Sequence, residues 1–153
     1  MGASTKVSSI IQAPRKVIYQ AFLNPDALAA WRAPKNMKAR VHEFDAREGG
    51  AYRMSLTYTE PKNSPGGKTS EDTDTFQGKF IELVPYEKIV ELIEFESRDA
   101  RFAGEMTMTT SFTEVEAGTE VTVLCENLPT GIRPEDNELG CRSSLQNLAR
   151  FVE

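Results

Sequence analysis

The chain has 153 residues, of which 39% are hydrophobic and 27% are charged, and its formal net charge is −5. This length suits a single domain over residues 1–153, and the composition excludes a fibrous or wholly disordered chain. The negative charge and scattered basic residues argue against a nucleic-acid partner, because phosphate binding requires clustered Lys and Arg. No apolar run is long enough to span a membrane and no signal peptide opens the chain, so we expect no membrane insertion and a cytoplasmic location.

The first part of the chain predicts one strand followed by two short helices. Polar and β-branched residues alternate over Ser4–Ile11, which indicates a strand. Apolar residues at helical spacing predict a helix over Arg15–Leu23, and Pro14 stands where proline is tolerated at a helix start. Asn24 then caps a second helix, which we expect over Ala27–Trp31.

Six more strands follow, because the hydrophobic period changes from that of a helix to that of a strand. The alternating segments are Lys38–Asp45, Ala51–Thr59, Thr75–Val84, Lys88–Glu96, Gly104–Val115 and Thr119–Glu126. Glu60–Asp74 is polar and contains several Pro and Gly residues, which predicts a loop. Gly78, inside the strand after this loop, predicts a bulge or a bend that curves the sheet.

A long helix closes the chain, beginning at Pro134 and running to near the last residue. Glu135 and Asp136 lie in its first turn, where carboxylates complement the helix dipole, and Leu145 and Leu148 share one face. A curved antiparallel sheet that holds such a helix encloses a space between the two. The sequence therefore predicts an α+β fold with about six to seven strands and an internal cavity.

Five short strings, spread over almost the whole chain, support a more specific assignment. They are Asn24-Pro25-Asp26-Ala27-Leu28 before Trp31, Val41-His42-Glu43-Phe44-Asp45 before Gly49-Gly50, the segment from Phe76 to Pro85, Gly104-Glu105-Met106-Thr107, and Gly118-Thr119-Glu120-Val121. In this order they resemble the START/SRPBCC superfamily, which has the helix-grip fold, and within it the branch named for homology to the activator of the heat-shock-protein-90 ATPase. The resemblance implies a cavity between the sheet and the terminal helix that accepts lipids, polyketides or other apolar molecules.

One position departs from the pattern of this family. Relatives often carry Trp after the helix glycine, whereas Gly140 is followed by Cys141 here. If Cys141 faces inward, its smaller side chain enlarges the cavity.

The candidate ligand-binding residues come from the predicted inward faces of the strands and of the terminal helix. Thioether and aromatic side chains make adaptable apolar walls, and a few polar groups orient a ligand. The candidates are Trp31, Glu43, Tyr52, Met54, Met106, Met108, Thr110, Phe112, Cys141, Ser144 and Leu145. Core packing is the alternative role for the apolar members of this set.

No motif names a reaction or a catalytic residue. His42 is the single histidine and is expected at the surface, which excludes a metal site built from several histidines. The nucleophile string Gly-x-Ser-x-Gly does not occur. Glu91, Glu94 and Glu96 alternate with apolar residues on one predicted strand, so at least one carboxylate can share a face with the core and serve as a general acid. A strand with one face in water explains these glutamates more simply.

The leading hypothesis is a protein that holds an apolar or amphipathic small molecule in the cavity and needs no cofactor and no metal. An enzyme of the cyclase, dehydratase or hydrolase type in the same cavity is one alternative. A co-chaperone-like module that contacts a larger partner is another, and exposed strand edges also permit a homodimer. Cys125 and Cys141 are expected to be thiols rather than a disulfide.

Overall fold

One antiparallel sheet of seven strands frames the part of the chain that the computed structural model describes, residues 2–60 and 72–153. The strands lie in the order β1-β7-β6-β5-β4-β3-β2, so β1 and β2 form the two edges. They are β1 (Ala3–Ile11), β2 (Met37–Phe44), β3 (Ala51–Tyr58), β4 (Thr73–Val84), β5 (Lys88–Phe95), β6 (Glu105–Val115) and β7 (Gly118–Leu128). The helices are α1 (Arg15–Phe22), α2 (Pro25–Trp31), α3 (Pro134–Val152) and the short 3-10 helix η2 (Ala100–Phe102).

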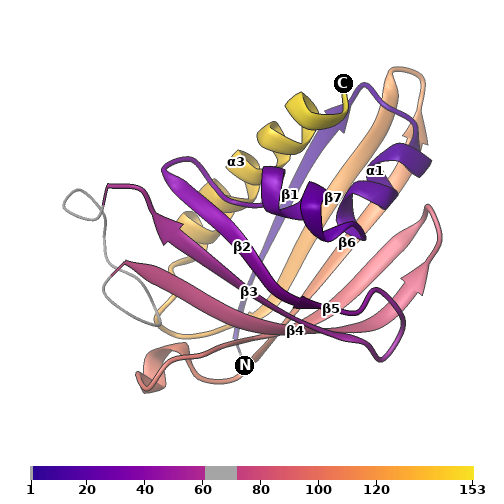
Figure 1. Ribbon diagram of the computed structural model, residues 1–153. Coiled ribbons are helices and arrows are strands. Elements are labelled where there is room, and N and C mark those ends of the chain that lie inside the picture. Colours follow the sequence, from indigo (N-terminus) through magenta and orange to yellow (C-terminus); the bar gives the residue numbers. More distant parts are fainter. Residues whose placement is uncertain (1, 61–71) are drawn as a thin grey trace.

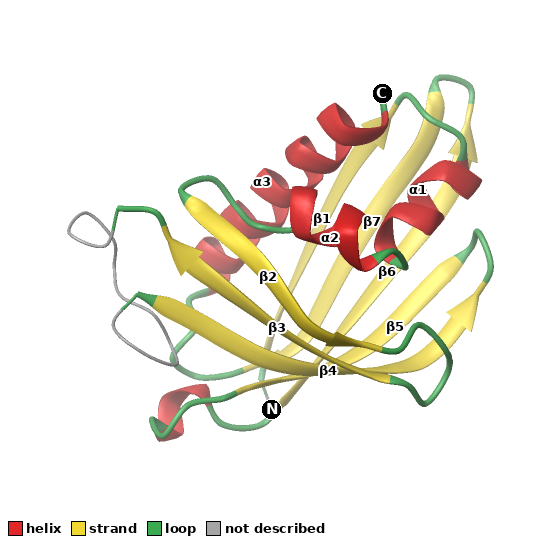
Figure 2. Cartoon of the chain, viewed as in Figure 1, coloured by secondary structure: helices red, strands yellow, loops and turns green. Residues whose placement is uncertain are grey.

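The sheet curves around α3, and α1 and α2 lie on the same side of the sheet as α3 (Figure 1). In the view coloured by secondary structure, the three α-helices form one layer and the strands form the other (Figure 2). This arrangement confirms the predicted α+β helix-grip fold, with two short helices after the first strand.

The order of the elements follows the sequence prediction, whereas some local boundaries differ. β4 begins at Thr73, which pairs with Thr57 of β3, so the loop predicted over Glu60–Asp74 ends too late. Residues 61–71 of that loop lie outside the described residues. The connection between β5 and β6, which the sequence shows only as a break in the alternation, contains η2.

Local sequence signals explain the start of α2. Asn24 Oδ1 accepts hydrogen bonds from the backbone N–H groups of Asp26 at 2.9 Å and Ala27 at 3.1 Å. Pro25 occupies the first turn, where a missing N–H costs nothing. The helix therefore begins two residues before the expected start at Ala27.

Gly78 is required for side-chain packing rather than for a bulge. The register between β4 and β5 shifts between Phe80 and Glu82, so the prediction of a bulge at Gly78 is wrong. Gly78 pairs with Tyr52 of β3, and a Cβ at Gly78 would lie 2.0 Å from Cζ of Tyr52. Glycine thus leaves room for the Tyr52 ring directly against the backbone of β4.

Polar side chains of α3 hold the segment that leaves α2. Ser144 Oγ donates a hydrogen bond to the carbonyl of Arg32, and Asn147 Nδ2 donates one to the carbonyl of Ala33, both at 2.7 Å. These bonds satisfy carbonyl groups at the end of α2 that have no partner within the helix. On the inner face of α3, Leu148 is fully buried in the core. The end of α2 and the middle of α3 are therefore fixed relative to each other.

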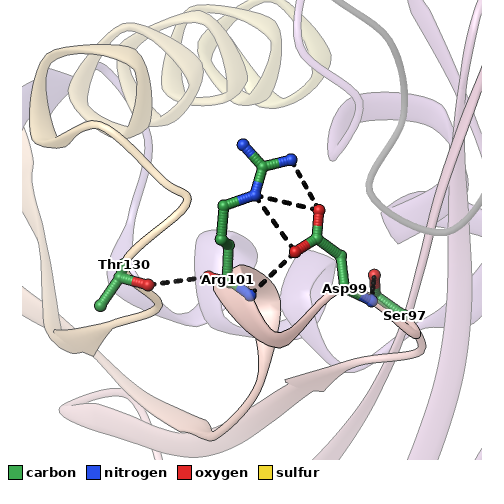
Figure 3. A network of polar contacts seen from close by, with 4 residues as sticks. All are labelled: Ser97, Asp99, Arg101 and Thr130. Carbon is green, nitrogen blue, oxygen red and sulfur yellow. Dashed lines mark hydrogen bonds and ion pairs between the residues drawn. The ribbon is translucent and has the colours of Figure 1, made fainter.

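The chain leading into α3 is held by η2 (Figure 3). The Asp99 carboxylate accepts from the backbone N–H of Arg101 at 3.0 Å and pairs with the Arg101 guanidinium at 2.6 Å. The carbonyl of Arg101 accepts hydrogen bonds from the N–H of Gly131 at 2.7 Å and from Thr130 Oγ1 at 3.4 Å. The start of α3 is thereby tied to the connection between β5 and β6.

Candidate functional site

A cavity of about 410 Å³ lies between the concave face of the sheet, the end of α2 and the N-terminal half of α3. Strands β3 to β7 contribute mainly apolar side chains to its wall, among them Leu56, Phe76, Ile93, Phe95 and Val123. The part of the wall that α3 contributes includes Gly140 and the short side chains of Cys141 and Ser144. The inward position of Cys141 meets the condition under which its small side chain enlarges the cavity.

Most of the predicted ligand-binding residues line this cavity. They are Trp31, Met106, Met108, Thr110, Cys141, Ser144 and Leu145. Strict alternation places Met106, Met108 and Thr110 on the inner face of β6, as the sequence pattern predicted. Ser144 differs from the others, because its hydroxyl already donates to the carbonyl of Arg32.

Glu43 does not line the cavity and points to solvent. The pairing of β2 with β3 shifts register between Val41 and Glu43, which breaks the alternation on which the prediction relied. After this irregularity His42 and Glu43 are both exposed, and Phe44 takes the inward position. His42 is at the surface, as expected, where its Nε2 lies 2.7 Å from Ser55 Oγ.

Tyr52, Met54 and Phe112 are buried but are not part of the cavity wall among the residues that the structure describes. The Tyr52 ring lies 5.3 Å from the Phe80 ring, and the Phe112 ring lies 5.3 Å from the Phe22 ring, measured between centroids. These side chains belong to the packed core beside the cavity. The alternation places them correctly on the inner face, but only the packing decides which inner side chains are covered.

Glu91 is the glutamate of β5 that faces the interior. It is 3% exposed, whereas Glu94 is exposed and Glu96 pairs with Arg53 at 2.7 Å. Tyr52 donates its hydroxyl hydrogen to Glu91 Oε1 at 2.6 Å. The other carboxylate oxygen, Glu91 Oε2, has no hydrogen-bond partner among the described residues. Burial, reinforced by the Glu91 carboxylate, raises the pKa of Tyr52 well above its usual value.

Arg32 is one of the cavity residues that the sequence prediction missed. It follows Trp31 at the C-terminal end of α2, lines the cavity and donates from Nη2 to Met108 Sδ at 3.4 Å. Burial opposes its charged form, yet the negative potential of Glu91 and Tyr52 raises the pKa of Arg32 above its usual value. Helical spacing does not predict where the Arg32 side chain points, because Arg32 is the C-cap of α2. The strands opposite orient this side chain.

The two cysteines meet where α3 lies over β7. Both are free thiols, as the sequence predicted, with Cys125 buried and Cys141 on the cavity wall. A hydrogen bond from the Cys125 thiol and the nearby Arg32 guanidinium lower the pKa of Cys141. The same hydrogen bond, together with burial, raises the pKa of Cys125. Cys141 is therefore the thiol that ionises more readily.

Charged side chains of different kinds lie at the two ends of the cavity. Arg32 interacts with Tyr52 at the start of β3, whereas Tyr58 lies at the end of β3, about 20 Å away at roughly 3.3 Å per residue. Burial raises the pKa of Tyr58, and the neighbouring carboxylates of Asp74 and Asp136 add to this effect. The end near Tyr58 thus holds two carboxylates with Lys35 nearby, and the end near Arg32 holds the guanidinium with the buried Glu91 carboxylate nearby.

Two further classes of site concern the described residues, namely a metal centre and a membrane-spanning helix. No group of three or more His, Cys, Asp or Glu side chains there is arranged to hold a metal ion. No helix in residues 2–60 and 72–153 is both long and apolar enough to cross a lipid bilayer.

Comparison with known proteins identifies the family. The family model described as Activator of Hsp90 ATPase homolog 1-like protein matches residues 12–153. A crystal structure of a protein from Chromobacterium violaceum is 33% identical, with a TM-score of 0.86 over 98% of this chain and 96% of that chain. A solution structure from Staphylococcus epidermidis has a TM-score of 0.75 at 18% identity over 99% of this chain and 90% of that chain.

A further structure carries the family designation in its description. The solution structure of an AHSA1-like protein from Aeromonas hydrophila has a TM-score of 0.72 at 16% identity over 98% of this chain and 92% of that chain. No curated protein matches the sequence. The chain belongs to the family of Activator of Hsp90 ATPase homolog 1-like proteins, within the START/SRPBCC superfamily of helix-grip folds.

Proposed function

We propose that this protein binds an apolar or amphipathic small molecule in the cavity between the sheet and α3. The observation that carries the proposal is the cavity itself, whose volume of about 410 Å³ falls within the usual range of ligand sites. Its wall is mainly apolar, so burying ligand carbon would contribute about 25 cal/mol per Å². The proposal requires no cofactor.

Each wall residue has a distinct part in this proposal. Trp31, Met106, Met108 and Leu145 would contact the apolar body of the ligand, because thioether and aromatic groups adapt to varied shapes. Cys141 would provide space rather than affinity. Ser144 would act indirectly by holding the end of α2, since its hydroxyl is engaged with the carbonyl of Arg32.

Trp31 allows a direct test, because it is the single tryptophan and lies on the cavity wall. Titration with fatty acids, polyketides and aromatic acids should change its fluorescence in a saturable way, and the same ligands should raise the thermal midpoint. The variant Cys141→Phe should fill the cavity and abolish both responses. The matched variant Arg142→Phe places the same ring at an exposed position of α3 and should bind as the wild type does. Saturable binding that Cys141→Phe leaves unchanged would refute the proposal.

Catalysis is a second candidate, and the observation behind it is the buried pair of Tyr52 and Glu91, which lies in the core beside the cavity and would have to gain access to the ligand. A cyclase, dehydratase or hydrolase reaction would use these groups for proton transfer. Loss of turnover in Glu91→Gln, with ligand affinity retained, would favour this candidate. Unchanged turnover in Glu91→Gln would remove Glu91 from the reaction.

The family designation favours contact with a chaperone as another candidate. Stimulation of a chaperone ATPase that is equal for wild type and Cys141→Phe would support an interaction surface independent of the cavity. Absence of binding to any chaperone would remove this candidate. A homodimer and a cytoplasmic location also stay predictions, and analytical ultracentrifugation and cell fractionation would test them.

A further inference from the structure

Arg32 retains hydrogen-bonding capacity that faces the cavity. A guanidinium group carries several N–H donors in a planar fork. The contacts of this one are a thioether sulfur, Met108 Sδ at 3.4 Å, and the hydroxyl of Tyr52. None of the ion pairs within 4.0 Å in the described part of the chain includes Arg32, although the Glu91 carboxylate is close enough to raise the pKa of Arg32. A half-buried cation with free donors is a site for an acceptor group.

Thr110 supplies a second, independent observation on the same wall. Its side chain is fully buried and lines the cavity, and its Oγ1 has no hydrogen-bond partner among the described residues. Thr110 lies two residues from Met108 on the inner face of β6, so the two side chains are about 7 Å apart along the strand. Met108 is the residue that Arg32 contacts, so Thr110 is one inward-facing position along β6 from the contact of the guanidinium.

We propose that the ligand of this cavity carries a carboxylate, which accepts hydrogen bonds from the Arg32 guanidinium and from Thr110 Oγ1. This inference rests on the proposed function and specifies its ligand class as an amphipathic carboxylic acid. A carboxylate matches the planar guanidinium fork in two parallel bonds, which a hydroxyl group cannot do.

The charges along the cavity fix the orientation of such a ligand. Lys35 also lines the cavity, but it lies toward the Tyr58 end, because the neighbouring Asn36 accepts from the N–H of Thr59 and Met37 pairs with Tyr58. Asp74 and Asp136 would repel an anion at this end, near Tyr58. The carboxylate therefore lies at Arg32, and the apolar body extends along β3 toward Tyr58.

Calorimetric titration with matched pairs of probes tests this assignment. Decanoate and 1-decanol share one chain, and 2-naphthoate and 2-naphthalenemethanol share one ring system, so each pair differs in the head group. Wild-type protein should bind each acid more tightly than its alcohol. Arg32→Met should weaken acid binding by about tenfold or more, as expected for a hydrogen bond to a charged group, and should leave alcohol binding within about twofold.

Three further variants complete the test. Thr110→Val should weaken acid binding by roughly threefold to tenfold, as expected for a single hydrogen bond. Arg40→Met removes one exposed positive charge from β2 and should bind every probe as wild type does. If Arg32→Met does not fold, Arg32→Lys keeps the charge without the planar fork and should retain acid binding at reduced affinity.

The outcomes separate this inference from the proposed function. Acid binding that is unchanged in Arg32→Met and Arg32→Lys would overturn the carboxylate assignment and leave the binding function intact. If the alcohols bind and the acids do not, the carboxylate assignment is likewise overturned and the binding function stands. If neither acids nor alcohols bind, the proposed function itself fails and the carboxylate assignment fails with it.

Discussion

At the scale of single residues, two buried hydroxyl groups on the inner face of the sheet are in opposite situations. Tyr52 donates to Glu91 at 2.6 Å, whereas Thr110 has no partner within the described residues. Removing a partner from a buried carboxylate costs its desolvation energy, while removing an unpartnered hydroxyl costs little. The stability of variants at these positions should therefore separate structural polar groups from those reserved for a ligand.

Tyr52→Phe should lower the free energy of unfolding by about 1 to 3 kcal/mol. The variant leaves both oxygens of Glu91 without a hydrogen-bond partner in the described structure, because Oε2 already has none. Urea denaturation monitored by circular dichroism measures this change.

Thr110→Val is the matched control for this prediction. It also removes one buried hydroxyl group, but the free energy of unfolding should be unchanged or raised by about 1 kcal/mol. A loss in Thr110→Val as large as the loss in Tyr52→Phe would contradict the distinction between the two hydroxyls.

Alkylation of the cysteines should show their different ionisation. The pKa of Cys141 is lowered and that of Cys125 is raised, and the thiolate is the reactive form. As pH rises, iodoacetamide should therefore modify Cys141 first, at a pH below that of an ordinary thiol. Arg32→Met should move this modification to higher pH, because it removes a positive charge that stabilises the thiolate.

Protein is treated with iodoacetamide over a pH series, and mass spectrometry of its peptides measures the extent of alkylation at each cysteine. Arg40→Met is again the control and should leave the pH dependence of Cys141 alkylation unchanged. Modification of Cys125 ahead of Cys141 would contradict the assigned hydrogen bond between the two thiols.

At the scale of elements, two glycines have opposite roles. Gly78 in β4 makes room for the Tyr52 ring, whereas a Cβ at Gly140 in α3 would meet only Pro34 Cγ at 3.9 Å. The strand thus depends on its glycine for side-chain packing, and the helix does not.

Gly140→Ala should raise the free energy of unfolding by about 0.5 to 1 kcal/mol, since alanine loses less backbone entropy in a helix. Gly78→Ala should lower it by about 1 to 3 kcal/mol, because the new methyl group displaces the Tyr52 ring. Thermal and urea denaturation of both variants check the signs. Equal effects of the two substitutions would show that the Tyr52 ring does not constrain Gly78.

At the scale of the whole molecule, the cavity is built from elements at both ends of the chain. α2, the strands from β3 to β7 and α3 all contribute to its wall. Global unfolding must destroy the site, so ligand binding is linked to the stability of the entire fold.

A ligand at about 100 times its dissociation constant should raise the free energy of unfolding by about 2.7 kcal/mol. The comparison uses urea denaturation with and without decanoate. Arg142→Phe should show the full gain, and Cys141→Phe should show none. A ligand that binds but leaves the urea midpoint unchanged would indicate a site outside the cooperative fold.

The sequence by itself determined the order of the elements, the α+β helix-grip fold and the inner face of most strands. Alternation is a local property, so it placed Met106, Met108 and Thr110 correctly, and it failed at Glu43, where a register shift in β2 interrupts it. The alternation of apolar and polar residues does not predict that neighbouring side chains cover Tyr52.

The tertiary structure alone decided which inner side chains remain open to the cavity and where its charge lies. Glu91 and Arg32 are far apart in sequence and come together because β5 lies opposite the end of α2. The direction of a side chain at a helix end depends on what packs against it, and no sequence period records this. Only the packing of the strands opposite α2 therefore shows that Arg32 lines the cavity.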